Sequence, residues 1–213
     1  MKNLEKIISF LKDPNTYWSS KGNLVIENDF EIKPQDFLNY AEKDLQDTYS
    51  HNLINTLSNA KRALDCQVDI LLIAFGYYNI SKNKFWGFPK KIEIIKELGI
   101  LAPRVLLKVN KTRNLMEHQY VKPTLEQVED FVDIVALFMA STDKYIYNFP
   151  DDLEIENDYL DSFWLKFSNN YEGENLRINV IYKNSENEEL IITYKDIGYS
   201  ELLNLILKIG NKN

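Results

Sequence analysis

The sequence of 213 residues contains a single cysteine, Cys66. One thiol excludes an internal disulfide and any metal site built from several cysteines. No apolar run approaches the roughly eighteen residues that a membrane-spanning helix needs. The first residues include an acid, where a secretory signal peptide would be basic and then apolar. We therefore expect a cytoplasmic protein without a metal ion or another cofactor.

Glycine and proline are also scarce, with seven and six residues, whereas 45% of the chain is hydrophobic. Thirteen tyrosines and eleven phenylalanines add large apolar surfaces. This composition is typical of a folded chain with a substantial core and argues against disorder. The length fits one large domain, or one domain with a small companion.

The net charge of −7 is unevenly distributed. Residues 82–122 contain ten Lys or Arg and three Asp or Glu, whereas residues 151–213 contain thirteen acids and six bases. A phosphate group responds to nearby charge more than to the distant total, so the basic segment indicates a local anion site. A solvated helix face would have the same composition.

The apolar spacing predicts a short helix over residues 3–12 and, less regularly, a hairpin of two strands over 17–33. Residues 35–75 keep a helical stripe without glycine or proline, as one long helix or as two joined near 47–50. A further helix is expected over 89–98, ending at Gly99.

Residues 104–122 lie between two prolines and have the pattern of another helix. The sequence Thr124-Leu-Glu-Gln127 has the spacing of a capping box, which predicts a helix from there to about residue 145. Together these segments predict an antiparallel helical bundle over residues 34–148.

The period changes to two near the C-terminus. We expect an acidic connector at 151–158, and then strands over 163–167, 176–182 and 190–194, followed by a helix over 201–209. The predicted fold class is thus α+β, mainly α: an N-terminal helix and hairpin (1–33), the bundle (34–148), and a small companion (159–210) with a three-stranded meander plus helix.

Rare residue types gather at the end of the basic helix. Arg113 and Glu117 are four positions apart, as are Asn114 and His118, so all four lie on one side of a helix; Tyr120 follows. An ordinary ion pair and a histidine at a negative helix terminus would also explain them. However, the chain has only two histidines and four arginines, so chance rarely produces this spacing.

The order Arg113-x4-His118, with a polar residue after the arginine, resembles the R-x4-6-H signature of HEPN domains. With Tyr120 it resembles the R-x4-H-x-Y form of HEPN toxins from HEPN/MNT toxin–antitoxin pairs. The resemblance implies a HEPN-like bundle and a metal-independent endoribonuclease, of the toxin or phage-defence type, with its active site between two protomers. It also implies that an antitoxin could modify Tyr120, although a packed tyrosine is the simpler interpretation.

The residue types suit RNA cleavage on their own. His118 could exchange a proton with the 2′-OH or the leaving oxygen, Arg113 could hold the charged phosphorane, and Asn114 could orient either partner. A homodimer would double this small catalytic set. We place Glu117, Tyr120 and two lysines of the same helix among the candidate binding residues; the lysines are Lys108 and Lys111.

Weaker candidates lie elsewhere. His51 and Cys66 are more simply structural residues, and Asp65 and Asp69 lack a third metal ligand. A loop combines cations with an aromatic ring on which bases could stack, although its lysines could also be merely solvated; it contains Lys82, Lys84, Trp86, Lys90 and Lys91.

Three hypotheses remain open from the sequence. The first is the HEPN-type ribonuclease acting on RNA as a dimer. The second is a non-catalytic HEPN-like module that binds RNA, a nucleotide or a protein, with the acidic C-terminal part, residues 151–213, facing an antitoxin or another partner. The third is a plain dimerisation scaffold.

Overall fold

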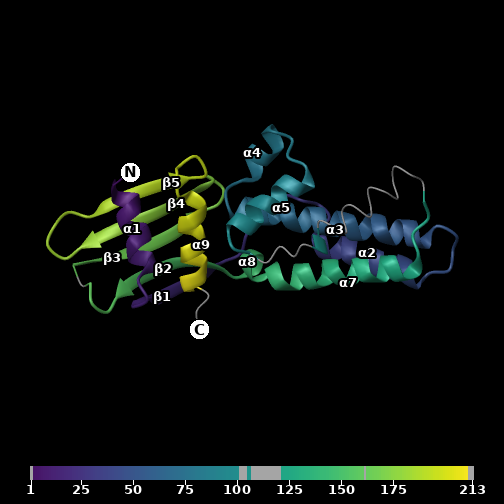
Figure 1. Ribbon diagram of the computed structural model, residues 1–213, viewed down its shortest axis with the longest axis horizontal. Coiled ribbons are helices and arrows are strands. Elements are labelled where there is room, and N and C mark those ends of the chain that lie inside the picture. Colours follow the sequence, from purple (N-terminus) through teal and green to yellow (C-terminus); the bar gives the residue numbers. More distant parts are fainter. Residues whose placement is uncertain (1, 101–104, 107–120, 161, 211–213) are drawn as a thin grey trace.

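The computed structural model describes residues 2–100, 105–106, 121–160 and 162–210. Figure 1 shows an elongated molecule with a β-sheet and two helices at one end and a group of helices at the other. The helical end lies in the chain between the first and second strands of the sheet.

One antiparallel sheet contains five strands in the order β1-β2-β3-β4-β5. Their bounds are β1 (Thr16–Leu24), β2 (Phe149–Asn157), β3 (Phe163–Asn170), β4 (Asn175–Tyr182) and β5 (Glu188–Thr193). The predicted fold class was wrong here, because the sheet is not a three-stranded meander. The last three strands lie where the sequence predicted them, and two further strands extend the sheet.

The missed strands carry weak signals. β2 occupies the segment interpreted as an acidic connector. In it, Leu153 and Ile155 are buried, whereas Glu154 and Glu156, which alternate with them, are only half-buried. This alternation is typical of a strand with one solvated face. The expected hairpin over 17–33 does not form: its first half is β1, which pairs with β2 across 130 or so positions of sequence, with irregular register around Ser20.

Two helices cover one face of this sheet (Figure 1). They are α1 (Lys2–Lys12) and α9 (Tyr199–Gly210), which correspond to the helices predicted at the two ends of the chain. Leu202, Leu203 and Ile206 of α9 are buried and belong to the same core cluster as the strand residues Phe167 and Ile178. The apolar side chains between these two helices and the sheet form the part of the core at this end of the molecule.

The helical end contains α2 (Pro34–Gln46), α3 (Asn52–Ala74), α4 (Tyr78–Asn83), α5 (Phe88–Glu97), α7 (Leu125–Thr142) and α8 (Lys144–Tyr147). The sequence predicted either one long helix or two helices over residues 35–75, and the structure has two. They are separated by a turn in which the side chain of Asn52 donates to the carbonyl of Asp47 at 2.6 Å. The predicted capping box is present, since the Gln127 amide donates to Thr124 Oγ1 at 3.3 Å and Thr124 N to Gln127 Oε1 at 3.0 Å.

The two ends of the molecule share one hydrophobic core. The end of α3 meets the sheet through Asn169, whose side chain donates to the Ala74 carbonyl at 3.0 Å, and through Tyr199, whose hydroxyl donates to the Phe75 carbonyl at 2.9 Å. The amide of Ile26 donates to the carbonyl of Ile146 at 2.7 Å, which joins the chain entering the helices to the chain leaving them. How the chain divides into domains stays a prediction.

Within the described part of the chain, none of the helices combines the length and the apolar character required to cross a membrane.

Candidate functional site

The catalytic cluster predicted from the sequence lies outside the described residues. This applies to all its members and to the candidate binding residues beside them: Lys108, Lys111, Arg113, Asn114, Glu117, His118 and Tyr120. The structure does describe what borders them. Leu106 before the segment is fully buried, and Pro123 after it is buried just before the capped start of α7. The described residues that border the segment are therefore anchored by burial.

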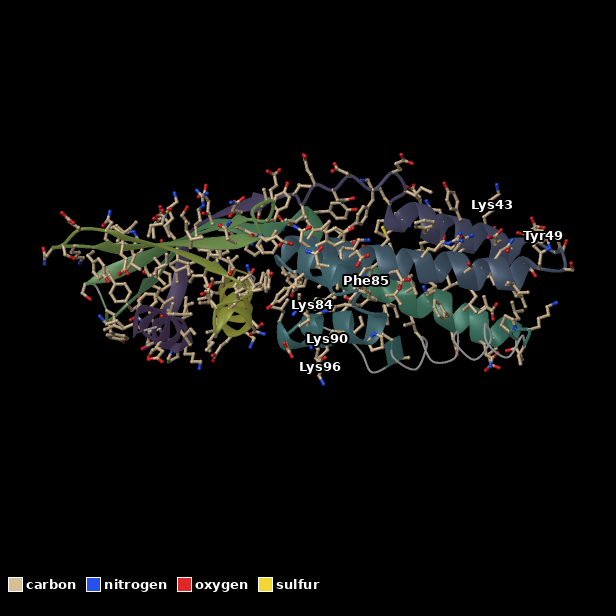
Figure 2. All side chains as sticks on the ribbon, turned by 90° about the horizontal axis from the view of Figure 1, so that it is seen from above. Lys43, Tyr49, Lys84, Phe85, Lys90 and Lys96 are labelled. Carbon is tan, nitrogen blue, oxygen red and sulfur yellow. The ribbon has the colours of Figure 1, made fainter. Side chains whose placement is uncertain are left out.

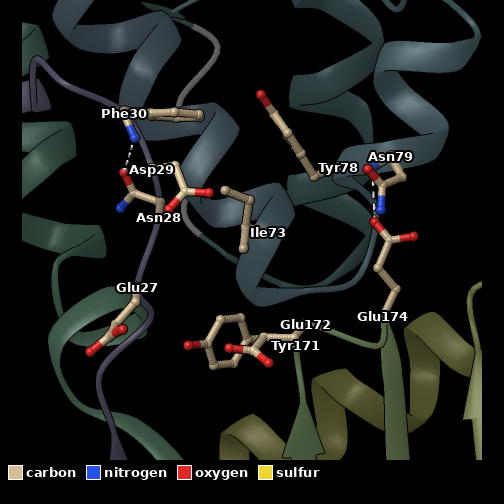
Figure 3. Close-up of a pocket in the computed structure, with 10 residues that line it drawn as sticks. All are labelled: Glu27, Asn28, Asp29, Phe30, Ile73, Tyr78, Asn79, Tyr171, Glu172 and Glu174. Atoms are coloured by element: carbon tan, nitrogen blue, oxygen red, sulfur yellow. Dashed lines mark hydrogen bonds between the residues drawn. The ribbon is translucent and has the colours of Figure 1, made fainter.

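A cavity of about 520 Å³ opens where the helices meet the sheet (Figure 3). It is lined by the connector after β1, by the ends of α3 and α4, and by the turn between β3 and β4. The lining residues are Glu27, Asn28, Asp29, Phe30, Ile73, Tyr78, Asn79, Tyr171, Glu172 and Glu174. The sequence offered no local signal for this cavity, because its walls come from three segments that are distant in the chain.

The chemistry of this cavity is acidic and aromatic. Four carboxylates and three aromatic rings face it, and among the described residues that line it none is a lysine, arginine or histidine. The rings of Phe30 and Tyr78 lie 5.9 Å apart, and Glu174 accepts a hydrogen bond from the amide of Asn79 at 2.8 Å. Because like charges repel, phosphate groups are disfavoured here. The cavity therefore suits neither an RNA backbone nor a general acid–base pair built on histidine.

Positive charge gathers instead on a neighbouring surface formed by α4, α5 and the turn between them. We call it the α4–α5 surface and define it by five exposed residues: Lys82, Lys84, Phe85, Lys90 and Lys96. Figure 2 shows four of them along one side of the molecule. Phe85 is 92% exposed, the largest exposed fraction among the described large hydrophobic residues.

The other members of the predicted loop have structural roles. Lys91 is half-buried and forms an ion pair with Asp69 at 2.5 Å. Trp86 is half-buried, and its ring centroid lies 6.4 Å from that of Tyr77. Lys90 lies over the Trp86 ring, 6.0 Å from its centroid. In the loop that the sequence suggested for base stacking, Trp86 and Lys91 are therefore packed against the protein, whereas Phe85 projects into solvent. Phe85 was not singled out from the sequence.

The exposed lysines differ in their partners. Lys90 pairs with Glu93 at 2.9 Å, and this hydrogen bond raises the pKa of the lysine. Lys82 lies 5.6 Å from the centre of the Tyr78 ring. Lys84 and Lys96 have no ion pair within the described ranges. These two side chains are therefore available to an anionic ligand.

The remaining candidates have local structural explanations. The ring of His51 stacks on Tyr49 with centroids 4.4 Å apart, at the start of α3. The thiol of Cys66 donates to the Ile32 carbonyl at 3.7 Å, and burial raises its pKa to about 11, which leaves little reactive thiolate at neutral pH.

The acid pair considered for a metal ion is occupied by lysines. Asp65 pairs with Lys61 at 2.5 Å, and Asp69 pairs with Lys91. Across the described ranges, no group of three or more His, Cys, Asp or Glu side chains is placed to hold a metal ion.

Comparison with family models, with curated proteins and with solved structures gave no significant match. The functional assignment therefore depends on the residues of this chain alone.

Proposed function

We propose that the protein is a metal-independent endoribonuclease of the HEPN type. The observation that carries this proposal is the order of Arg113, Asn114 and His118 within the only strongly basic segment of an acidic chain. Chance produces this spacing rarely in a protein with two histidines. The RNA itself supplies the nucleophile, so a metal ion is not required for the reaction.

Each residue has a role in this chemistry. The imidazole of His118 accepts the proton of the 2′-OH or donates one to the leaving 5′-oxygen, because its ordinary pKa lies near neutral pH. The guanidinium of Arg113 binds the phosphorane through two parallel hydrogen bonds. Asn114 orients the phosphate. Since two proton transfers need two groups, a second protomer supplies the other histidine at a two-fold interface.

The described residues support RNA as the substrate through charge. The α4–α5 surface directly precedes the catalytic segment in the chain, and its four lysines attract a polyanion. The carboxylates of the cavity repel one. RNA that approaches the molecule is therefore attracted to the α4–α5 surface and repelled by the acidic cavity.

Cleavage of single-stranded RNA in the presence of EDTA tests this proposal. The wild type should cut the RNA, and Arg113→Ala and His118→Ala should each lower the rate by about a hundredfold or more, as expected for loss of a general acid–base or charge-stabilising group. The chain offers controls in its other histidine and in a described, exposed arginine: His51→Ala and Arg62→Ala should leave the rate unchanged. Activity that requires added metal, or that survives the first two substitutions, would contradict the proposal.

The composite site makes a separate demand on oligomeric state. Light scattering of the active protein should give the mass of a dimer. Mixing Arg113→Ala with His118→Ala protomers should restore part of the activity only if the two residues act across an interface. A strictly monomeric enzyme would refute the two-protomer arrangement.

The alternative is a dimeric HEPN-like module that binds RNA, a nucleotide or a protein without cutting. Its specific support is the acidic C-terminal part, with thirteen acids against six bases, which suits a protein partner such as an antitoxin better than RNA. RNA binding that weakens with salt, without cleaved product, would favour it. In either case we place the protein in the cytoplasm, in a toxin–antitoxin or phage-defence setting.

A further inference from the structure

The turn that ends α4 has an unusual residue at its critical position. The amide of Phe85 donates to the Lys82 carbonyl at 3.1 Å, and the amide of Trp86 donates to the Ser81 carbonyl at 2.9 Å. This pair of hydrogen bonds defines a Schellman cap, in which the residue at Phe85 adopts a left-handed conformation. Its φ is +51°.

Two other helices of this chain end in the same way but with glycine. Gly76 after α3 has φ +68° and Gly99 after α5 has φ +73°, and each donates the equivalent hydrogen bond to its helix, at 3.1 and 2.9 Å. Glycine is the usual residue there because a side chain strains the left-handed conformation. A phenylalanine at this position needs another explanation than the stability of the cap.

Burial does not supply that explanation. The Phe85 side chain is 92% exposed, so its ring contributes almost nothing to the core. The next residue, Trp86, packs towards Tyr77 and holds the turn in place. The chain therefore fixes the backbone beside Phe85 firmly and leaves the ring itself in water. Rigid attachment of an exposed aromatic ring is what a binding platform requires.

The charges around the ring identify its partner. Lys82 and Lys84 precede Phe85, and Lys90 and Lys96 follow in α5; Figure 2 shows Lys84, Phe85, Lys90 and Lys96 on one side of the molecule. No acid occurs between residues 82 and 92, and the two acids of α5 are Glu93, which pairs with Lys90, and Glu97. A polyanion with exposed flat faces matches both the cations and the ring, whereas an ordinary protein surface matches only the ring.

We propose that Phe85 is a stacking platform for an unpaired base of single-stranded RNA, with the lysines of the α4–α5 surface binding the adjacent phosphates. This inference rests on the proposed function, because it gives the ribonuclease a place to hold its substrate. It adds a specificity: duplex RNA, whose bases are already stacked, should bind more weakly than single strands.

The test is a binding measurement with the full-length protein carrying His118→Ala, so that the RNA remains intact. Fluorescence anisotropy with a labelled twelve-nucleotide poly(U) strand gives Kd. Phe85→Gly removes the ring and places at this cap the residue that α3 and α5 already use, so the fold should be retained. Loss of one stacked base should raise Kd about tenfold, within the range measured for base–aromatic contacts.

Two further variants complete the design. Phe85→Trp should keep the Kd within about threefold of the parent, because it presents a ring of the same kind. Tyr159→Ala removes an aromatic residue that is 80% exposed in the sheet part of the molecule, and it should leave Kd unchanged. An effect of Tyr159→Ala equal to that of Phe85→Gly would show a non-specific contribution of exposed rings and overturn the inference.

Other outcomes also decide the matter. An unchanged Kd for Phe85→Gly, or equal binding of duplex RNA, would refute the stacking role. A change of dimer mass caused by Phe85→Gly, with Kd unaffected, would assign the ring to a contact between protomers. Cleavage by the wild type separates the two proposals. If the wild type cuts RNA and Phe85→Gly leaves Kd unchanged, only the stacking role is refuted. If Phe85→Gly weakens RNA binding but the wild type does not cut RNA, only the ribonuclease proposal is refuted.

Discussion

Replacing Phe85 with glycine should raise the free energy of unfolding, whereas replacing Gly76 with alanine should lower it. Both positions are the left-handed residue of a helix cap, with φ of +51° and +68°. One substitution therefore removes a side chain from a left-handed residue, and the other adds one. Their effects depend on the backbone and on the space beside it.

For Phe85→Gly, release of the left-handed strain is worth about 1–2 kcal/mol. The added backbone freedom of glycine in the unfolded chain costs about 0.5–1 kcal/mol. The ring is 92% exposed, so no appreciable burial is lost. The balance is a gain of up to about 1.5 kcal/mol.

For Gly76→Ala the terms reverse and a contact is added. A Cβ at Gly76 would lie 3.0 Å from the Tyr199 hydroxyl and 3.3 Å from the backbone of Glu174. Tyr199 is buried and donates to the Phe75 carbonyl, so it cannot move without losing that hydrogen bond. Strain and crowding together should cost about 1–3 kcal/mol.

Urea unfolding followed by circular dichroism measures both effects, since the slope of free energy against urea should be unchanged and only the midpoint should move. A loss of more than about 1 kcal/mol in Phe85→Gly would show that the ring is packed in solution, and the platform would be excluded. A neutral Gly76→Ala would refute the account of the cap. If Phe85→Gly is more stable and binds RNA less well, the ring is retained for function at the expense of stability.

Two further predictions concern the corrected sheet and the single thiol. Leu153→Ala should destabilise the protein by about 2–5 kcal/mol, because it truncates a fully buried strand residue, while Glu154→Ala should have little effect. Urea unfolding midpoints measure both effects. If residues 151–158 were a solvated connector, both substitutions would be neutral. Cys66 should react slowly with iodoacetamide at pH 8 in the folded protein and rapidly in urea, because burial raises its pKa to about 11. Since the folded thiol ionises later than the unfolded one, its contribution to stability should be complete below about pH 8.5 and fall as pH rises through 11. Comparison with Cys66→Ser, which lacks this contribution, isolates it from the titration of tyrosines and lysines.

The sequence predicted most helices well because their signals are local. The stripe of α3, the capping box at Thr124 and the glycine after α5 each lie within a few residues of the feature they specify. The same holds for β4, whose alternation is regular. Strands that pair across the inserted helices have no such signal. β1 contains Ser19, Ser20 and Lys21, and nothing in those residues indicates that they meet β2.

The candidate sites also differ in whether their sequence signals are local. Arg113 and His118 were found from spacing alone, and their role stays a prediction. The acidic cavity joins Phe30, Tyr78 and Tyr171, which become neighbours only through the insertion of the helices between β1 and β2. Phe85 did have a local signal, an aromatic residue where a helix cap would normally have glycine, but it becomes visible only once α4 is known to end at residue 83.

This topology changes how the role of the C-terminal part must be tested. The strands and helix of the C-terminal part share one sheet and its cover with β1 and α1, which come from the N-terminus. Removing the C-terminal part would expose the buried faces of α1 and β1, and lost activity would then report unfolding rather than a missing partner site. The amide of Ile26 and the carbonyl of Ile146 lie 2.7 Å apart, so the inserted helices begin and end at neighbouring points. Surface substitutions on the sheet, and not truncations, are therefore the informative test of a protein partner there, since they leave that shared core in place.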